Sequence, residues 1–180
     1  MRKSLAAVSC LLAVSSVLCA QQLPRKSAEL QMSVPGGKTV LLSQYKGKPV
    51  VLAFILTTCS HCQFTTGLLV KMQNEFGPKG VQVLECAVNP NADNLVPAFK
   101  TDYKTNFPVG WNFDQDYLLK EFIQHPMTKT PSMPILLFID RKGMVRAQYE
   151  GQDDFIESPN QEQNIRTQIK ALLLTPTVSR

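Results

Sequence analysis

The fold of this chain is decided by residues 50–62, whose sequence is VVLAFILTTCSHC. Val50–Leu56 is a continuous apolar run rich in β-branched and aromatic residues, which predicts a short central strand buried on both faces. Cys59–Ser60–His61–Cys62 follows, and beyond it an apolar residue recurs at every fourth position, which predicts a helix with one apolar face. The residues of that face are Phe64, Leu68, Met72 and Phe76. Two cysteines therefore lie at the junction of a buried strand and a helix.

The segments around this core complete an α/β pattern. Ala28–Ser33 and Lys38–Leu42 flank the turn residues Pro35–Gly36–Gly37, which predicts an N-terminal β-hairpin. The later elements are a strand at Val81–Val88, a helix capped by Asp93 or Asn94 that continues through Thr105, a helical stretch at Asp116–Gln124, strands at Ile135–Ile139 and Met144–Tyr149, and a helix at Gln163–Leu174. This order predicts a central mixed β-sheet with helices on both faces.

The N-terminus has the layout of an export signal. Arg2 and Lys3 supply a basic start, Leu5–Leu18 forms an apolar run, and cleavage is expected after Ala20. The run is too short to span a membrane comfortably, and no later segment reaches its length. An uncleaved anchor and a lipidated Cys19 are the alternatives. We expect a mature domain of residues 21–180, periplasmic or secreted, monomeric and without a transmembrane span.

The charge balance gives no support for a nucleic-acid partner. The formal net charge is +5, and it falls to +3 once Arg2 and Lys3 are removed with the signal. No run of Lys or Arg with interleaved aromatic residues occurs in the chain. A domain of residues 21–180 is also long enough to bury a core of its own.

The cysteine count separates reactive from structural candidates. Two of the five cysteines lie in the signal, so that Cys59, Cys62 and Cys86 remain. An odd number argues against a disulfide scaffold, whereas two cysteines separated by two residues in an exported chain are candidates for chemistry. Cys86 lies inside a strand run, and we expect it to be buried and inert.

The position of the cysteine pair predicts thiol–disulfide exchange. Cys59 would lie at the helix start, where free backbone N–H groups and the helix dipole favour the thiolate that attacks a disulfide. Cys62 would lie one turn further on and resolve the mixed disulfide. A charged His61 would stabilise the thiolate and make the pair more oxidising. The alternative is that His61 is a solvated residue without an electronic role.

Other uses of the cysteines are less well supported. A structural disulfide across so short a loop would constrain the unfolded chain little. A zinc site requires four ligands, and the chain has no second C-x-x-C or H-x-x-x-H motif. A copper site built from Cys59, Cys62 and a histidine stays open, because thiolates suit copper. Apart from His61, only His125 could supply that histidine.

The order of motifs resembles that of the TlpA/ResA-type thioredoxin-like proteins. The matching stretches are LSQYKGKPVVLAF at 42–54, TCSHC at 58–62, MP at 133–134 and LFIDRKG at 137–143. The resemblance spans Ala28–Leu174 and implies a thioredoxin-like fold with a cis peptide bond at Met133–Pro134. Met133 and Pro134 would then lie opposite the cysteines and dock an extended substrate strand. The alternative is that Pro134 follows an ordinary trans peptide bond and that Pro131 is the proline opposite the cysteines.

The resemblance also implies the reaction and its partners. We expect exchange of the Cys59–Cys62 pair with protein thiols or disulfides, a separate redox partner that recycles the pair, and no metal or other cofactor. The direction of electron flow stays open. A copper chaperone of the SCO type, whose cysteines are separated by three residues, and a peroxiredoxin, which carries Thr at the position of Leu56, are the alternatives.

Several residues depart from the family pattern. Thr57–Thr58 replaces an aromatic residue before the first cysteine, and Thr65 replaces an acidic residue beyond the second. We therefore expect no carboxylate beneath Cys62. Ser60–His61 resembles the dipeptide of more oxidising relatives such as DsbA and protein disulfide isomerases. Residues 91–127 are longer than a minimal thioredoxin requires, and we expect an inserted helical segment of unknown role.

Overall fold

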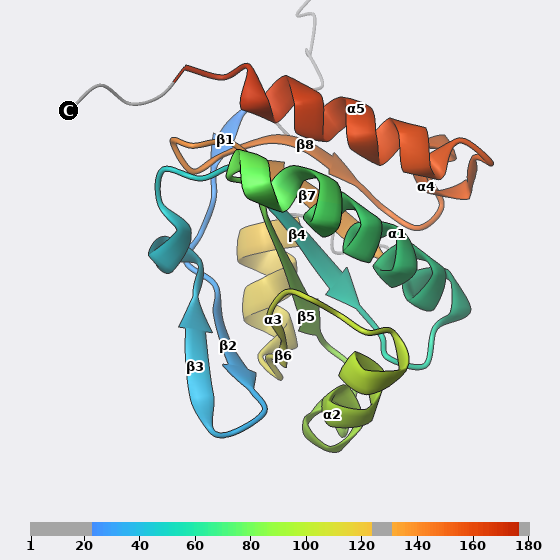
Figure 1. Ribbon diagram of the computed structural model, residues 1–180. Coiled ribbons are helices and arrows are strands. Elements are labelled where there is room, and N and C mark those ends of the chain that lie inside the picture. The colour runs from blue at the N-terminus through green and yellow to red at the C-terminus, as the bar shows by residue number, and fades with distance from the viewer. Residues whose placement is uncertain (1–22, 124–130, 177–180) are drawn as a thin grey trace, which may run out of the picture.

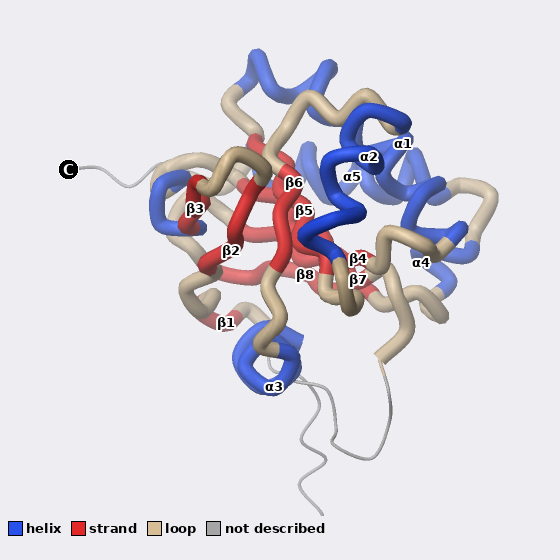
Figure 2. The backbone as a smooth tube through the Cα atoms, turned by 90° about the horizontal axis from the view of Figure 1, so that it is seen from below, coloured by secondary structure: helices blue, strands red, loops and turns tan. Residues whose placement is uncertain are grey.

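The computed structural model describes residues 23–123 and 131–176. The predicted signal at residues 1–20 and His125 lie outside the described residues. Within these two ranges, eight strands form one mixed sheet in the order β1-β8-β7-β4-β5-β6-β2-β3 (Figures 1 and 2). The strands are β1 (Arg25–Lys26), β2 (Gln31–Val34), β3 (Lys38–Leu41), β4 (Val50–Ile55), β5 (Gln82–Ala87), β6 (Val109–Trp111), β7 (Ile135–Ile139) and β8 (Met144–Tyr149).

Strand β4 is central, as its apolar run predicts. It runs parallel to β5 and antiparallel to β7, and all six of its residues are buried. Alternate residues face opposite halves of the core, because successive side chains of a strand point to opposite faces. Val51, Ala53 and Ile55 face one half, and Val50, Leu52 and Phe54 face the other.

Helices cover both faces of the sheet. They are α1 (Ser60–Phe76), α2 (Ala92–Asp102), α3 (Gln115–Tyr117), α4 (Asp154–Glu157) and α5 (Gln161–Leu173), with a π-helical segment at Leu118–Ile123 and 3₁₀ turns at Leu42–Tyr45 and Gly77–Lys79. Helices α1, α2, α4 and α5 pack on one face, and α3 with the π-helical segment packs on the other (Figure 2). None of the described helices has the length and apolar composition that a membrane span requires.

The predicted hairpin and the four predicted strands are confirmed within a few residues at their ends. β2 pairs antiparallel with β3, and Ser33 pairs with Trp111 of β6, so the hairpin continues the main sheet. The C-terminal helix is also confirmed and begins at Gln161, two residues before the predicted start.

The start of α2 differs from the prediction. Asp93 and Asn94 lie inside the helix, and the residue that precedes it is Asn91, with a φ of 62°. Asn tolerates this left-handed conformation better than most residues, and its carbonyl accepts the first hydrogen bonds, from Asn94 and Leu95. The helix ends at Asp102 rather than at Thr105.

Helix α1 forms as predicted, but its buried face is different. Phe64 is 63% exposed, whereas Leu68, Met72 and Phe76 are buried. Cys62, Thr65, Thr66 and Leu69 complete the buried face. The assignment of Phe64 to the core side is therefore wrong.

Candidate active site

Cys59 lies between the end of β4 and the start of α1. It is the N-cap residue of α1, with extended backbone angles, and its Sγ accepts a hydrogen bond from the Cys62 N–H at 3.4 Å. A sulfur in this position can accept hydrogen bonds from the free N–H groups of the first helical turn. It also lies at the positive end of the helix dipole. Cys59 is half-buried, so an incoming disulfide can reach it.

Cys62 has a contrasting environment one turn into the helix. Its side chain is fully buried, and its Sγ accepts the Leu56 N–H at 3.5 Å. Burial, the largest effect, raises the pKa of the Cys62 thiol far above its ordinary value. The pair therefore consists of an accessible sulfur that accepts a helix N–H and a buried thiol that holds its proton.

A buried carboxylate lies beneath this pair, contrary to the expectation from Thr65. Glu85 of β5 is the register neighbour of Ala53 in β4, and its side chain is fully buried. Its charge is close enough to contribute to the raised pKa of Cys62. Glu85 lies on an adjacent strand rather than along the chain from Cys62, and the signal for it was a lone charged residue in an apolar strand run.

Thr66 connects Glu85 with the active-site helix. Its Oγ1 lies 2.9 Å from Glu85 Oε1 and 2.9 Å from the Cys62 carbonyl oxygen. A hydroxyl has one proton, so both contacts are hydrogen bonds at once when Glu85 is protonated and donates to Thr66. Burial raises the pKa of Glu85 to about 8. Glu85 Oε2 has no hydrogen-bond partner among the described residues.

Met133 and Pro134 lie against the cysteines. The Met133–Pro134 bond is cis, and the Met133 carbonyl oxygen lies 4.0 Å from Cys59 Sγ. Gly151, which sequence reasoning missed, packs on this segment: its N–H donates to the Ser132 carbonyl at 2.8 Å. A Cβ at Gly151 would collide with the Met133 carbonyl, so the close approach requires glycine.

The loop before Cys59 is held by polar side chains that the sequence did not single out. Asn89 Oδ1 accepts the Thr57 N–H at 2.9 Å, and Gln63 Nε2 donates to the Thr57 carbonyl at 2.9 Å. Thr57 is buried, so these bonds satisfy backbone groups that water does not reach. Thr57–Thr58, where the TlpA/ResA pattern has an aromatic residue, thus lies in a loop that is held by hydrogen bonds.

The other predicted residues occupy separate environments. His61 is exposed on the first turn of α1, and within residues 23–123 and 131–176 nothing donates to it or accepts from it. Cys86 is fully buried in the half-core on the α3 side, and burial raises the pKa of its thiol to about 12. In the described part of the chain, no group of three or more His, Cys, Asp or Glu side chains is placed to hold a metal.

The sheet, the flanking helices and the cysteine pair at the β4–α1 junction define a thioredoxin-like fold, and solved structures share it. A thiol:disulfide interchange protein of the thioredoxin family from Chlorobium tepidum TLS superposes with a TM-score of 0.69 at 19% identity, over 86% of this chain and 99% of that one. The thioredoxin domain of a Bacteroides vulgatus thiol-disulfide oxidoreductase gives a TM-score of 0.66 at 17% identity, over 85% and 99%. An uncharacterized conserved protein from Geobacillus kaustophilus gives 0.71 at 20%, over 88% and 86%.

Residues 20–148 match the AhpC/TSA family, and the chain belongs to that family. No curated protein matches the sequence significantly. Family membership establishes the ancestry of the domain, and its reaction has to be argued from the site.

Proposed function

We propose that the protein is a thiol:disulfide oxidoreductase of the TlpA/ResA type that exchanges the Cys59–Cys62 pair with protein substrates. The observation that carries this proposal is the asymmetry of the pair. Cys59 is accessible at a helix N-cap, Cys62 is fully buried three residues further on, and the Met133 carbonyl lies 4.0 Å from Cys59 Sγ.

In the reducing direction, the Cys59 thiolate attacks a substrate disulfide. A mixed disulfide forms, and one substrate thiolate leaves. Cys62 then loses its proton and attacks Cys59 Sγ, which releases the second substrate thiolate and leaves a Cys59–Cys62 disulfide. The substrate gains two electrons and the enzyme pair loses two. The same steps run backwards when the enzyme acts as an oxidant.

Glu85 is the buried group that accepts the Cys62 proton in this scheme. It lies under α1, and its contact with Thr66 connects it to the turn that carries Cys62. A buried carboxyl whose pKa is near the working pH can both take and return a proton. The backbone of Met133 would pair with the substrate strand.

Substitution of each cysteine tests the proposal. Reduction of insulin by dithiothreitol, followed as turbidity, should be accelerated by the wild type and not by Cys59→Ser. Cys62→Ser should accumulate mixed disulfides, visible on non-reducing gels. Cys86→Ser is the control and should retain activity, because Cys86 is buried away from the pair. Full turnover by Cys59→Ser would overturn the assignment.

The direction of electron flow is tested by the midpoint potential in glutathione buffers. A value near or above about −180 mV indicates an oxidase or isomerase, and one near or below about −270 mV a reductase with its own electron donor.

Peroxide reduction is the competing reaction. Leu56 stands where a peroxiredoxin carries Thr, and its N–H is directed to Cys62, so we expect no rapid peroxide consumption.

Export directed by a signal peptide at residues 1–20, which is then cleaved, is part of the same proposal. Mass spectrometry of the protein recovered from outside the cytoplasm should find an N-terminus at Gln21. An intact Met1 would indicate the uncleaved anchor instead.

A further inference from the structure

A groove of about 750 Å³ lies between α1 and the junction of α4 with α5. Its α1 wall is formed by His61, Phe64, Leu68 and Lys71, which are spaced by three, four and three residues and so form one stripe along the helix. Ile156 and Pro159 belong to the opposite wall. The volume is within the range of pockets that bind small ligands or side chains.

The groove lining includes several apolar side chains. Leu68 and Ile156 are almost fully buried, while Phe64 is 63% exposed. Phe64 therefore presents an apolar surface to water beside the groove, which a bound partner would cover. The lining residues Lys71 and Glu162 form an ion pair, and Glu157 adds a further carboxylate to the lining.

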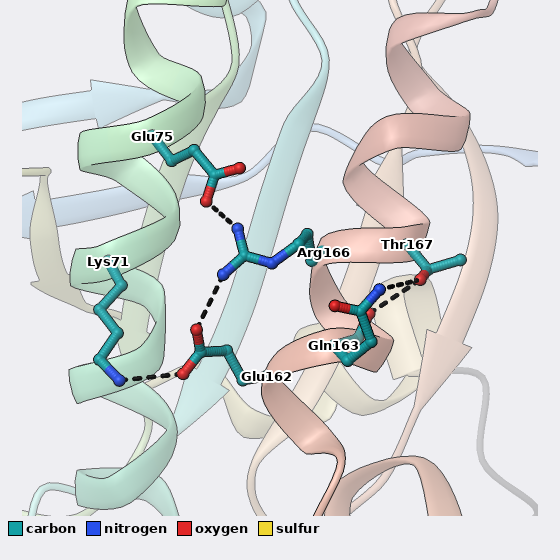
Figure 3. A network of polar contacts seen from close by, with 6 residues as sticks. All are labelled: Lys71, Glu75, Glu162, Gln163, Arg166 and Thr167. Carbon is teal, nitrogen blue, oxygen red and sulfur yellow. Dashed lines mark hydrogen bonds and ion pairs between the residues drawn. The ribbon is translucent and has the colours of Figure 1, made fainter.

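The walls of the groove are fixed relative to each other. Figure 3 shows Glu162 between Lys71 of α1 and Arg166 of α5, and Arg166 also reaches Glu75 of α1. Beneath them, the buried Gln161 Nε2 donates to Thr65 Oγ1 at 2.9 Å. The recess therefore exists before any partner binds, which reduces the entropy lost on binding.

The groove adjoins the cysteine motif. His61 belongs both to that motif and to the groove lining, so a chain bound at Cys59 can continue into the groove. Phe64 is five residues from Cys59, which corresponds to about 7.5 Å along a helix. An extended substrate chain covers about 3.3 Å per residue, so two or three of its residues match this rise along the helix axis.

We propose that this groove binds a large apolar side chain of a protein substrate, two or three residues from the cysteine that reacts with Cys59. The inference rests on the proposed function and adds the substrate class: polypeptides with an apolar residue next to their disulfide. Small thiols and peptides that are polar at this position would react at Cys59 without using the groove.

Two peptides test this inference. They carry one cysteine as a mixed disulfide with glutathione and differ by Phe or Ser three residues from it. The second-order rate constant for their reduction is measured with the reduced wild type, with Phe64→Ser and with Phe113→Ser. Phe113 is the matched control, because it is 52% exposed and lies outside the groove lining.

The wild type and Phe113→Ser should reduce the Phe peptide about tenfold faster than the Ser peptide, a ratio that burial of one apolar side chain can supply. In Phe64→Ser the ratio should fall towards one. An equal rate for both peptides with the wild type, or an unchanged ratio in Phe64→Ser, would overturn the inference. Self-association that Phe64→Ser weakens would assign the groove to a second copy and overturn it as well.

The two levels of the argument fail separately. If the wild type reduces neither peptide nor oxidised glutathione, the proposed oxidoreductase function itself is wrong. If it reduces all three and does not distinguish the peptides, only the groove assignment is wrong.

Discussion

Glu85 is a carboxyl group that the protein keeps in its interior without an ion-pair partner among the described residues. The TlpA/ResA pattern has an acid just beyond the second cysteine, and this chain has Thr65 there. The sheet register instead places Glu85 beside Ala53 and under α1. Strand register depends on long-range pairing, so local sequence could not reveal this neighbour, although a single Glu in an apolar run was a visible anomaly.

Replacement of this carboxyl should slow the resolving step. In Glu85→Gln, attack by Cys62 on the mixed disulfide should be slower by at least about tenfold, because the proton acceptor is lost. In the wild type the rate should rise with pH through about 8, where Glu85 becomes able to accept a proton. Rapid-quench measurement of the mixed disulfide checks this result. An identical pH profile in both proteins would exclude the role.

The same substitution should change how stability depends on pH. The pKa of Glu85 is raised from 4.5 to about 8 in the folded protein. The folded state therefore holds a proton that the unfolded state has released, and stability falls as pH rises from about 4.5 to about 8. Between pH 6 and pH 8 the decrease should be on the order of 2 kcal/mol in urea unfolding. Glu85→Gln should lose this decrease, and an equally steep decrease would contradict the assignment.

His61 is placed to alter the redox potential rather than the fold. It is exposed on the first turn of α1, where a positive charge would stabilise the Cys59 thiolate and thus the reduced pair. His61→Val should make the midpoint potential more negative by at least about 30 mV, a tenfold change in the equilibrium constant. Equilibration with glutathione buffers measures it. An unchanged potential would mean that His61 is a solvated residue without an electronic role.

At the scale of single elements, α1 shows why a four-residue spacing wrongly predicted that Phe64 lies on the buried face of the helix. Four residues turn a helix by about 40° more than one full turn. Three such steps therefore carry Phe64 about 120° away from Phe76, which is the difference between a buried and an exposed face. Cys62, Thr65, Leu69 and Met72 follow the three-and-four spacing that a buried face requires.

Strand β6 is one of the elements that the sequence did not predict, together with the short β1 and α4. It has three residues and lies within the segment that was expected to be an inserted helical region. It pairs with β5 and β2, and Gly110 leaves room for the backbone of Ser33, which a Cβ would strike. A strand of this length has too few residues to show a periodic pattern, so its formation depends on partners on both sides.

The contact between α1 and α5 depends on Arg166. Its guanidinium is largely buried and reaches both Glu75 and Glu162. Arg166→Met should lower the free energy of unfolding by about 1 kcal/mol, and the difference should shrink in 1 M salt. Urea unfolding with both proteins measures this loss. Lys120→Met, at an exposed pair with Glu121, is the control and should show no loss, and an equal loss in both variants would contradict a special role for Arg166.

At the scale of the whole molecule, the sheet divides the core into two halves that share β4. Phe122 of the π-helical segment is 1% exposed and meets Phe54 of β4 edge to face, with ring centroids 5.5 Å apart. Phe122→Ala should lower the free energy of unfolding by about 3–4 kcal/mol in one cooperative transition. Phe113→Ala, at an exposed ring, should change it by less than about 0.5 kcal/mol. A loss below about 1 kcal/mol at Phe122 would mean that this segment is an appendage to the core.

The parts of the fold that the sequence predicted are those with strong local patterns. The apolar runs of β4, β5 and β7 and the position of the cysteines are examples. The parts that it missed depend on distant neighbours: Glu85 through strand register, Gly151 through its contact with Met133, and the groove through the packing of α5 on α1. A linear pattern carries information about its own element and little about the surface opposite it.

The two ends of the sheet have a consequence for behaviour at high concentration. One edge is β1, with Arg25 and Lys26, and the other is β3, which begins at the exposed Lys38. Both edges are short and carry positive charge, so two molecules that approach edge to edge repel each other before their backbones can pair. The protein is thus protected against fibril-like association along its sheet edges.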